Sequence, residues 1–104
     1  MLTTLILAAG SSLAAQTPQN VEFAKPVRMQ AGGTYVKVES PGYAAPAWAD
    51  VDDDGRPDLL VGQFRGGKIL VCRNTGEGDL VGEALAEGAW LQAEGKVAEV
   101  PGVW

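Results

Sequence analysis

The spacing of apolar and polar residues in the first half of the chain predicts β-strands. Residues 35–39, Tyr-Val-Lys-Val-Glu, alternate with a period of two, which is the pattern of a half-buried strand. Residues 31–34, Ala-Gly-Gly-Thr, precede them and favour a tight turn, and residues 27–30 supply a partner strand. We therefore expect a β-hairpin over residues 27–39.

Two further apolar runs predict a second hairpin. Residues 59–64 and 68–73 are rich in branched apolar side chains, and the segment Arg-Gly-Gly at 65–67 separates them. Strands joined by so short a connection are antiparallel neighbours, so these two runs are expected to form the centre of a sheet.

The segments beside this second hairpin have less regular patterns. Residues 46–49 form a short extended run that leads directly into Asp50. Residues 74–79 have the composition of a loop, and residues 83–88 suit either one helical turn or a further connection. Together the patterns predict an all-β chain of antiparallel strands.

Between these runs lies the acidic loop, which we define as residues 50–58, Asp-Val-Asp-Asp-Asp-Gly-Arg-Pro-Asp. It contains five acidic residues and one arginine, so its charge of −4 accounts for most of the chain's formal net charge of −5. The acidity is therefore local, and it gives no support to nucleic-acid binding.

The spacing of the acids in this loop fits calcium. Calcium takes about six to eight oxygen ligands, and a short loop supplies them when alternate residues point inward and the backbone turns sharply midway. Gly55, at the sixth position, permits this turn, and Asp53 is expected to point outward. The predicted ligands are Asp50, Asp52, Asp54, Arg56 through its carbonyl oxygen, and Asp58.

Two other interpretations of the acidic loop compete with calcium binding between strands. Aspartate-rich loops are also common as soluble turns held by side-chain hydrogen bonds, although such turns rarely place the acids at these intervals. An EF-hand requires a bidentate glutamate at the twelfth position, where Val61 stands, and helices on both sides, where the sequence is β-like. The spacing therefore favours a calcium loop between two β-strands.

A comparison of the chain with itself indicates an internal repeat. At an offset of 62 residues, residues 28–38 align with residues 90–100, with Gln, Ala, Gly and Val in the same places. Met29 then corresponds to Leu91, so the apolar pattern is kept where identity is lost. A second repeat begins in this segment.

Residues 49–62, Ala-Asp-Val-Asp-Asp-Asp-Gly-Arg-Pro-Asp-Leu-Leu-Val-Gly, and residues 66–76 resemble the FG-GAP/VCBS repeat. That family builds calcium-binding β-propellers, so the resemblance implies antiparallel propeller blades in a partial propeller. It also assigns the ligand role to the five residues named above. Two residues depart from the family pattern. The family often has Gly or Asn where this chain has Asp53, and an aromatic residue where it has Cys72. We interpret residues 15–88 as a first repeat and 89–104 as the start of a second, truncated one.

The first fourteen residues are expected to be a secretory signal peptide. Residues 2–13 are apolar and uncharged, and small residues precede Ala15, where signal peptidase would cleave. The alternative is a buried N-terminal strand or helix. A run of about a dozen residues is too short to span a bilayer, so no membrane span is expected. The predicted location is outside the cell, in the periplasm or on the cell surface.

The composition offers little for catalysis. The chain has no histidine, which removes Ser-His-Asp catalysis and the usual zinc sites. Cys72, the single cysteine, cannot form an internal disulfide and is expected to be buried and inert. The Trp and Tyr side chains suit packing in the core and between blades, or a stacking platform for sugars.

These observations favour a secreted, non-enzymatic repeat protein that acts in adhesion or as a scaffold that binds an extracellular protein or a glycan, with calcium in a structural role. Further blades of a longer chain or self-association would cover the exposed sheet. The alternative is the N-terminal part of a secreted propeller enzyme, a polysaccharide lyase or hydrolase, with catalytic residues beyond Trp104. Calcium affinity is expected to be weak, about 0.1 to 1 mM, as in extracellular modules.

Overall fold

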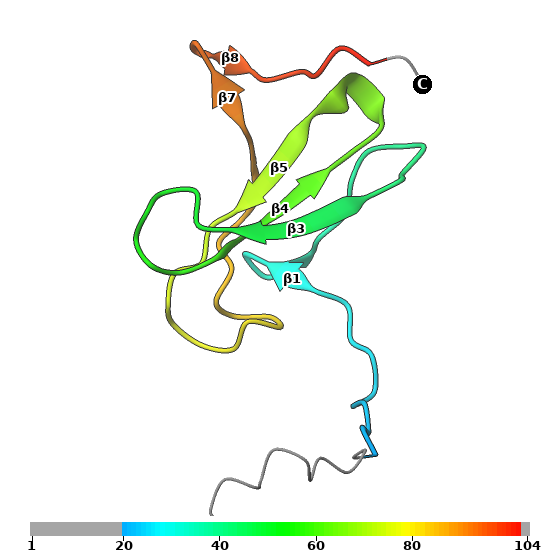
Figure 1. Cartoon of the computed structure of the whole chain (residues 1–104), viewed down its shortest axis with the longest axis vertical. Coiled ribbons are helices and arrows are strands. Elements are labelled where there is room, and N and C mark those ends of the chain that lie inside the picture. The colour runs from blue at the N-terminus through cyan, green and yellow to red at the C-terminus, as the bar shows by residue number, and fades with distance from the viewer. Residues whose placement is uncertain (1–19, 103–104) are drawn as a thin grey trace, which may run out of the picture.

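The computed structural model describes residues 20–102, and the predicted signal peptide at 1–14 lies outside this range. The described chain consists of short antiparallel strands and a single 3₁₀ turn, which confirms the all-β expectation (Figure 1). The propeller assignment stays a prediction. The elements are β1 (Gln30–Ala31), β2 (Thr34–Tyr35), β3 (Ala45–Ala49), β4 (Asp58–Gly62), η2 (Arg65–Gly67), β5 (Ile69–Cys72), β6 (Ala89–Trp90), β7 (Gln92–Ala93) and β8 (Lys96–Val97).

The centre of the molecule is a four-stranded antiparallel sheet in the order β3-β4-β5-β6. Strands β4 and β5 form the predicted second hairpin, in which Leu59 pairs with Cys72 and Val61 with Leu70. Paired residues of an antiparallel ladder project from the same face, so these four side chains form one apolar face. Strand β3 pairs only with β4 and is exposed along its whole length, so it is an edge of the sheet.

The predicted first hairpin, β1–β2, is shorter than expected and covers that apolar face. Its turn is Gly32-Gly33, and both glycines have positive φ, as a type I′ turn requires. Ala31 is buried against Leu59, Val61, Cys72 and Leu85, the core of the described chain.

Residues 83–88 form a connection without a helix, which resolves the alternative that their sequence left open. Leu85 makes an isolated bridge to Asn74, and Ala84 and Leu85 are both buried. The Gly32 amide donates a 2.9 Å hydrogen bond to the Leu85 carbonyl. This connection therefore serves as the surface on which the tip of the first hairpin rests.

A polar cluster joins the segment after β2 to the end of β4. Gln63 accepts a hydrogen bond from the Glu39 amide and donates one to the Glu39 carboxylate, at 3.0 and 2.7 Å. Lys68 pairs with the same carboxylate at 2.8 Å. The hydrogen bonds from Lys68 and then Gln63 lower the pKa of Glu39 below its ordinary value. The cluster fixes the direction in which the chain leaves the first hairpin.

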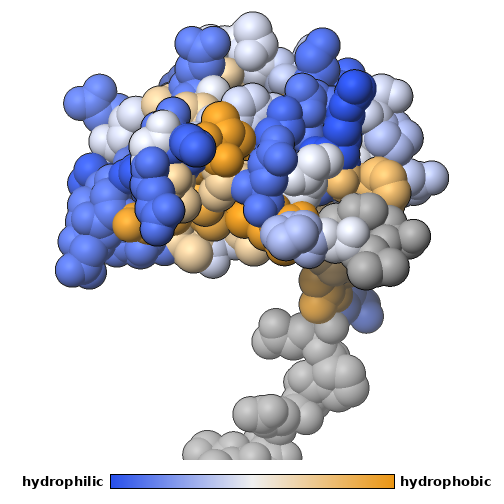
Figure 2. All heavy atoms as spheres, turned by 90° about the horizontal axis from the view of Figure 1, so that it is seen from above, coloured by the Kyte–Doolittle hydropathy of each residue, from blue (hydrophilic) through white to orange (hydrophobic). Residues whose placement is uncertain are grey.

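Several aromatic side chains that suit core packing lie at the surface instead. Trp48, Tyr35 and Tyr43 are each about half exposed or more. Figure 2 shows hydrophobic residues among hydrophilic ones on the face nearest β7 and β8. In residues 20–102, no helix has the length and apolar character needed to cross a bilayer.

Candidate metal centre

The acidic loop connects edge strand β3 to central strand β4. Ala49 and Asp58, which flank the rest of the loop, form the last pair of the β3–β4 ladder. The ladder therefore closes the loop at its base, and the intervening acids project from one end of the sheet. This is the position that the sequence pattern predicts, between two antiparallel strands.

Asp58 is fully buried at the base of the loop. One carboxylate oxygen accepts a 2.9 Å hydrogen bond from the Val51 amide, and the other accepts a 2.8 Å bond from the Asn74 amide. A buried carboxylate needs such partners, because burying its charge without hydrogen bonds costs on the order of several kcal/mol. The two bonds hold Asp58 in one orientation and tie the loop to the segment that follows β5.

Asp50 is exposed, but the backbone of the loop also fixes its orientation. Its two oxygens accept hydrogen bonds from the Asp54 and Gly55 amides, at 3.1 and 2.7 Å. Gly55 has φ +86°, a left-handed conformation that glycine adopts without steric cost, and it forms the sharp turn that its place in the loop predicts. The turn at Gly55 thus folds the middle of the loop back toward Asp50.

The folded loop brings three of the predicted ligands together. Asp50, Asp52 and Asp58 each offer a carboxylate oxygen, and these oxygens all lie within 4.8 Å of one another. Two oxygens bound on opposite sides of one calcium ion are about 5 Å apart, because each Ca–O distance is roughly 2.3 to 2.6 Å. The three carboxylates are therefore close enough to share a single cation.

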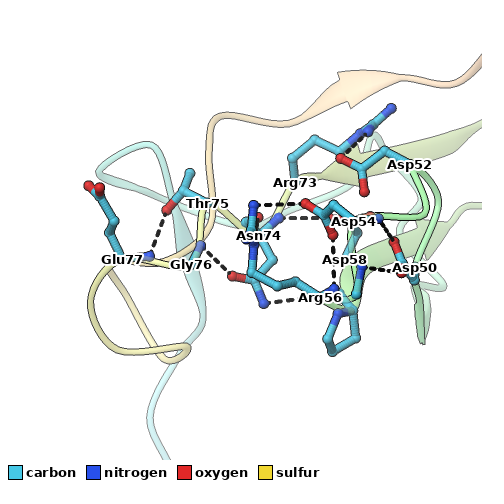
Figure 3. A network of polar contacts seen from close by, with 12 residues as sticks. Asp50, Asp52, Asp54, Arg56, Asp58, Arg73, Asn74, Thr75, Gly76 and Glu77 are labelled. Atoms are coloured by element: carbon cyan, nitrogen blue, oxygen red, sulfur yellow. Dashed lines mark hydrogen bonds and ion pairs between the residues drawn. The ribbon is translucent and has the colours of Figure 1, made fainter.

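Arg73, from the end of β5, provides a positive charge beside these carboxylates. Its guanidinium pairs with Asp52 at 2.8 Å, as Figure 3 shows. Desolvation raises the pKa of Asp52, but the hydrogen bond from Arg73 and the contacts with Asp50 and Asp54 outweigh it, and the pKa lies below its ordinary value. Asp52 is therefore held in the charged form that a metal requires.

Asp54 and Arg56, the other two predicted ligands, face each other. Both Asp54 oxygens accept hydrogen bonds from Arg56, one from the amide at 2.9 Å and one from the guanidinium at 2.8 Å. Asp54 is not part of the three-carboxylate group. Its ligand role and that of the Arg56 carbonyl stay predictions from spacing. Asp53 has φ +58°, is exposed and lies outside the group, and the outward orientation expected for it stays a prediction.

Asn74 is a residue of the site that the spacing argument missed. Its side chain donates to the Pro57 carbonyl at 3.0 Å and accepts from the Gly76 amide at 2.9 Å. The Arg56 side chain donates a 3.2 Å hydrogen bond to the backbone carbonyl of Asn74. The sequence Asn-Thr-Gly contains a signal for this role, since Asn often closes a turn by accepting from the amide two residues on.

The donors in this site suit a hard cation. Within residues 20–102, the group contains carboxylate oxygens and no sulfur or imidazole ligand. Cys72 is completely buried within β5, and burial raises the pKa of its thiol, so it stays protonated and unreactive. Hard divalent ions such as calcium and magnesium prefer oxygen ligands of this kind.

A comparison of the chain with protein-family models, with curated proteins and with solved structures finds no match. The case for a metal centre rests on the chain's own residues.

Proposed function

We infer that the chain is a calcium-binding β-repeat unit of the FG-GAP/VCBS type, in an exported, non-enzymatic protein that presents its sheets to an extracellular protein or glycan. The observation that carries the metal part of this proposal is the convergence of Asp50, Asp52 and Asp58, whose oxygens lie within 4.8 Å of one another. Three carboxylates at this spacing repel one another, and a divalent cation relieves that repulsion.

Calcium fits this site better than magnesium. Calcium accepts irregular arrangements of about six to eight oxygens. Magnesium instead demands a near-ideal octahedron with Mg–O distances of about 2.0 to 2.1 Å, and it gives up its bound water reluctantly. The site is exposed on the side of Asp50 and Asp52, which leaves room for water to complete the coordination. Affinity in the range of about 0.1 to 1 mM follows from the few protein ligands.

A structural role for the ion follows from the segments that the loop joins. Asp50 and Asp52 stand after β3, Asp58 begins β4, and Arg73 and Asn74 follow β5. Through Asp58, an ion would be linked to both the Val51 and the Asn74 amides. It would therefore strengthen the end of the sheet where three successive strands meet.

Calcium binding is tested by isothermal titration of the full chain with calcium and with magnesium. We expect one calcium site and at least about tenfold weaker binding of magnesium. The double variant Asp50→Asn/Asp52→Asn should lose the site, whereas Glu22→Gln/Glu77→Gln, which removes the same charge from exposed positions elsewhere, should keep it. Absence of calcium binding, or equal losses in the two double variants, would reject the proposal.

A further inference from the structure

The hairpin β1–β2 and its flanks carry a concentration of positive charge in an otherwise acidic chain. Residues 23–38 contain three basic residues, Lys25, Arg28 and Lys37, and no acidic one. This segment therefore has a charge of +3, whereas the whole chain has a formal net charge of −5. Positive charge gathers on the first hairpin as negative charge gathers in the acidic loop.

The register of the hairpin places two of these cations on one face. Gln30 pairs with Tyr35, and the next hydrogen bond outward keeps the same register. Two positions farther along each strand, Arg28 stands opposite Lys37 on that face, and both are exposed. The opposite face packs against the core through a set of apolar residues, Met29, Ala31, Val36 and Val38. The basic face therefore points away from the central sheet, which β1 adjoins in Figure 1.

The two cations of this face are not neutralised by the protein. Within residues 20–102, neither Arg28 nor Lys37 forms an ion pair, and like charges opposite each other destabilise a pair of strands. The Arg28 guanidinium carbon lies 4.4 Å from the centroid of the Tyr35 ring. Such stacking orients the guanidinium plane and leaves its N–H edge available to a carboxylate. An anion that bridges the two cations would relieve their repulsion.

The basic face borders an open hollow of about 730 Å³. Besides the two cations, its described lining residues are Gln30, Gly33, Thr34 and Tyr35. The amide and hydroxyl groups among them can donate to or accept from neutral hydroxyl groups. Tyr35 is the one large apolar side chain in this described set, so the hollow suits a ligand that is polar and carries negative charge.

The second hairpin, β7–β8, shows that hairpin formation does not account for the basic face. At the offset of 62 residues, β7 and β8 pair in the same register as β1 and β2. The positions that correspond to the two cations and Tyr35 are taken by Trp90, Glu99 and Val97. The same backbone structure therefore forms without the basic side chains, which favours a role for them in binding.

We propose that the outer face of β1–β2 binds a carboxylated glycan, a polysaccharide that contains uronate sugars. One sugar carboxylate would bridge the Arg28 guanidinium and the Lys37 ammonium group, and Gln30 would hydrogen-bond to sugar hydroxyls. This assignment rests on the proposed function for the class of partner, a glycan, and is independent of the metal site.

The observations favour a glycan over two other polyanionic partners. A protein interface takes roughly 20 to 30 residues on each side and has apolar anchors at its centre, whereas this hollow is small and polar. A nucleic acid carries a dense negative charge that the chain's formal net charge of −5 repels. A polysaccharide with one carboxylate on a sugar needs only the two cations that this face presents.

The test is isothermal titration of the full chain with an oligogalacturonate, in chelator so that calcium cannot link the sugar to the acidic loop. The matched probe is the same oligosaccharide with its carboxylates reduced to alcohols. We expect the oligogalacturonate to bind at least about tenfold more tightly than the reduced probe. The backbone amides whose NMR shifts change on binding should be those of residues 28–37.

Matched variants separate this face from charge in general. Arg28→Gln/Lys37→Gln should weaken binding at least about tenfold, because it removes both charge-assisted contacts. Arg65→Gln/Lys96→Gln removes the same charge from exposed positions elsewhere and should change the affinity by less than about twofold. Tyr35→Phe keeps the ring under the guanidinium and should bind normally, whereas Tyr35→Leu should bind about three- to tenfold more weakly.

Failure to bind the oligogalacturonate, equal affinity for the reduced probe, or equal losses in the two double variants would overturn the proposal. Tighter binding of a single-stranded DNA oligonucleotide or of a polyglutamate peptide would also overturn it, and would make the partner a nucleic acid or an acidic protein. The calcium titration that tests the metal site uses a different ligand and different variants. Loss of one activity is therefore distinguishable from loss of the other.

Discussion

Two aspartates of the acidic loop, Asp58 and Asp52, have different surroundings. Asp58, at the base, is fully buried and accepts hydrogen bonds from two backbone amides, whereas Asp52, farther out, is exposed and pairs with the Arg73 side chain. Asp58 therefore contributes to the fold whether or not a metal is bound. For the exposed acids, the proposal is that they contribute mainly through a bound cation. The following variants separate these two contributions.

The largest effect on stability is expected from Asp58→Ala. The substitution leaves the buried Asn74 amide and the partly exposed Val51 amide without their acceptor, and an unsatisfied buried donor costs about 1 to 3 kcal/mol. The free energy of unfolding in the presence of a chelator should fall by about 3 kcal/mol, as measured by urea denaturation. Asp53→Asn, at the exposed position outside the group, serves as the control. If the two variants were equally stable, buried Asp58 would contribute no more to the metal-free fold than an exposed aspartate of the loop does.

A large effect on affinity, with little effect on metal-free stability, is expected from Asp52→Asn. The substitution removes one of the three carboxylates that are close enough to share an ion, and the side chain it alters is exposed. Calcium affinity should fall by at least about tenfold, because ligand charge sets the strength of such sites. Titration calorimetry measures the affinity, and urea denaturation in chelator measures the stability. A variant that loses stability in chelator and keeps its affinity would reverse the assignment.

Arg73→Gln is expected to strengthen calcium binding. The Arg73 guanidinium occupies an Asp52 oxygen at 2.8 Å and competes with a cation for it. Its removal should tighten binding about three- to tenfold at low salt. Lys68→Gln removes the same charge from the ion pair with Glu39, and its affinity should not change. Weaker binding in Arg73→Gln would mean that the arginine orients Asp52 for the metal.

The smallest effect is expected from Asp54→Asn. Both oxygens of Asp54 are directed to Arg56, and the side chain is not part of the three-carboxylate group. The affinity for calcium should therefore change by less than about threefold, through loss of a nearby charge alone. A loss as large as that of Asp52→Asn would support the ligand role that the spacing predicts for Asp54.

The sequence predicted the parts of this molecule that local patterns determine. The hairpin β4–β5, the position of the acidic loop and the left-handed turn at Gly55 all follow from periodicity and turn chemistry. The role of residues 83–88 was left open, because their burial depends on contact with a hairpin more than fifty residues away.

The candidate site was predicted only in part for a similar reason. Spacing placed the aspartates in one loop, and the structure brings Asp50, Asp52 and Asp58 together. Spacing gave no indication of Arg73 and Asn74, which reach the loop from β5 through the pairing of strands. The positive charge of Arg73 pairs with Asp52, and the backbone amide of Asn74 donates to Asp58, so two residues outside the loop's own sequence position its acids.

The measurement that tests the account most directly is the free energy of unfolding of the full chain in about 10 mM calcium and in chelator. If the affinity is about 0.1 to 1 mM, linkage predicts that calcium stabilises the chain by about 1.4 to 2.7 kcal/mol. The Asp52→Asn variant should show a much smaller gain. Equal stability of the unmodified chain in calcium and in chelator would contradict a structural calcium site in the acidic loop.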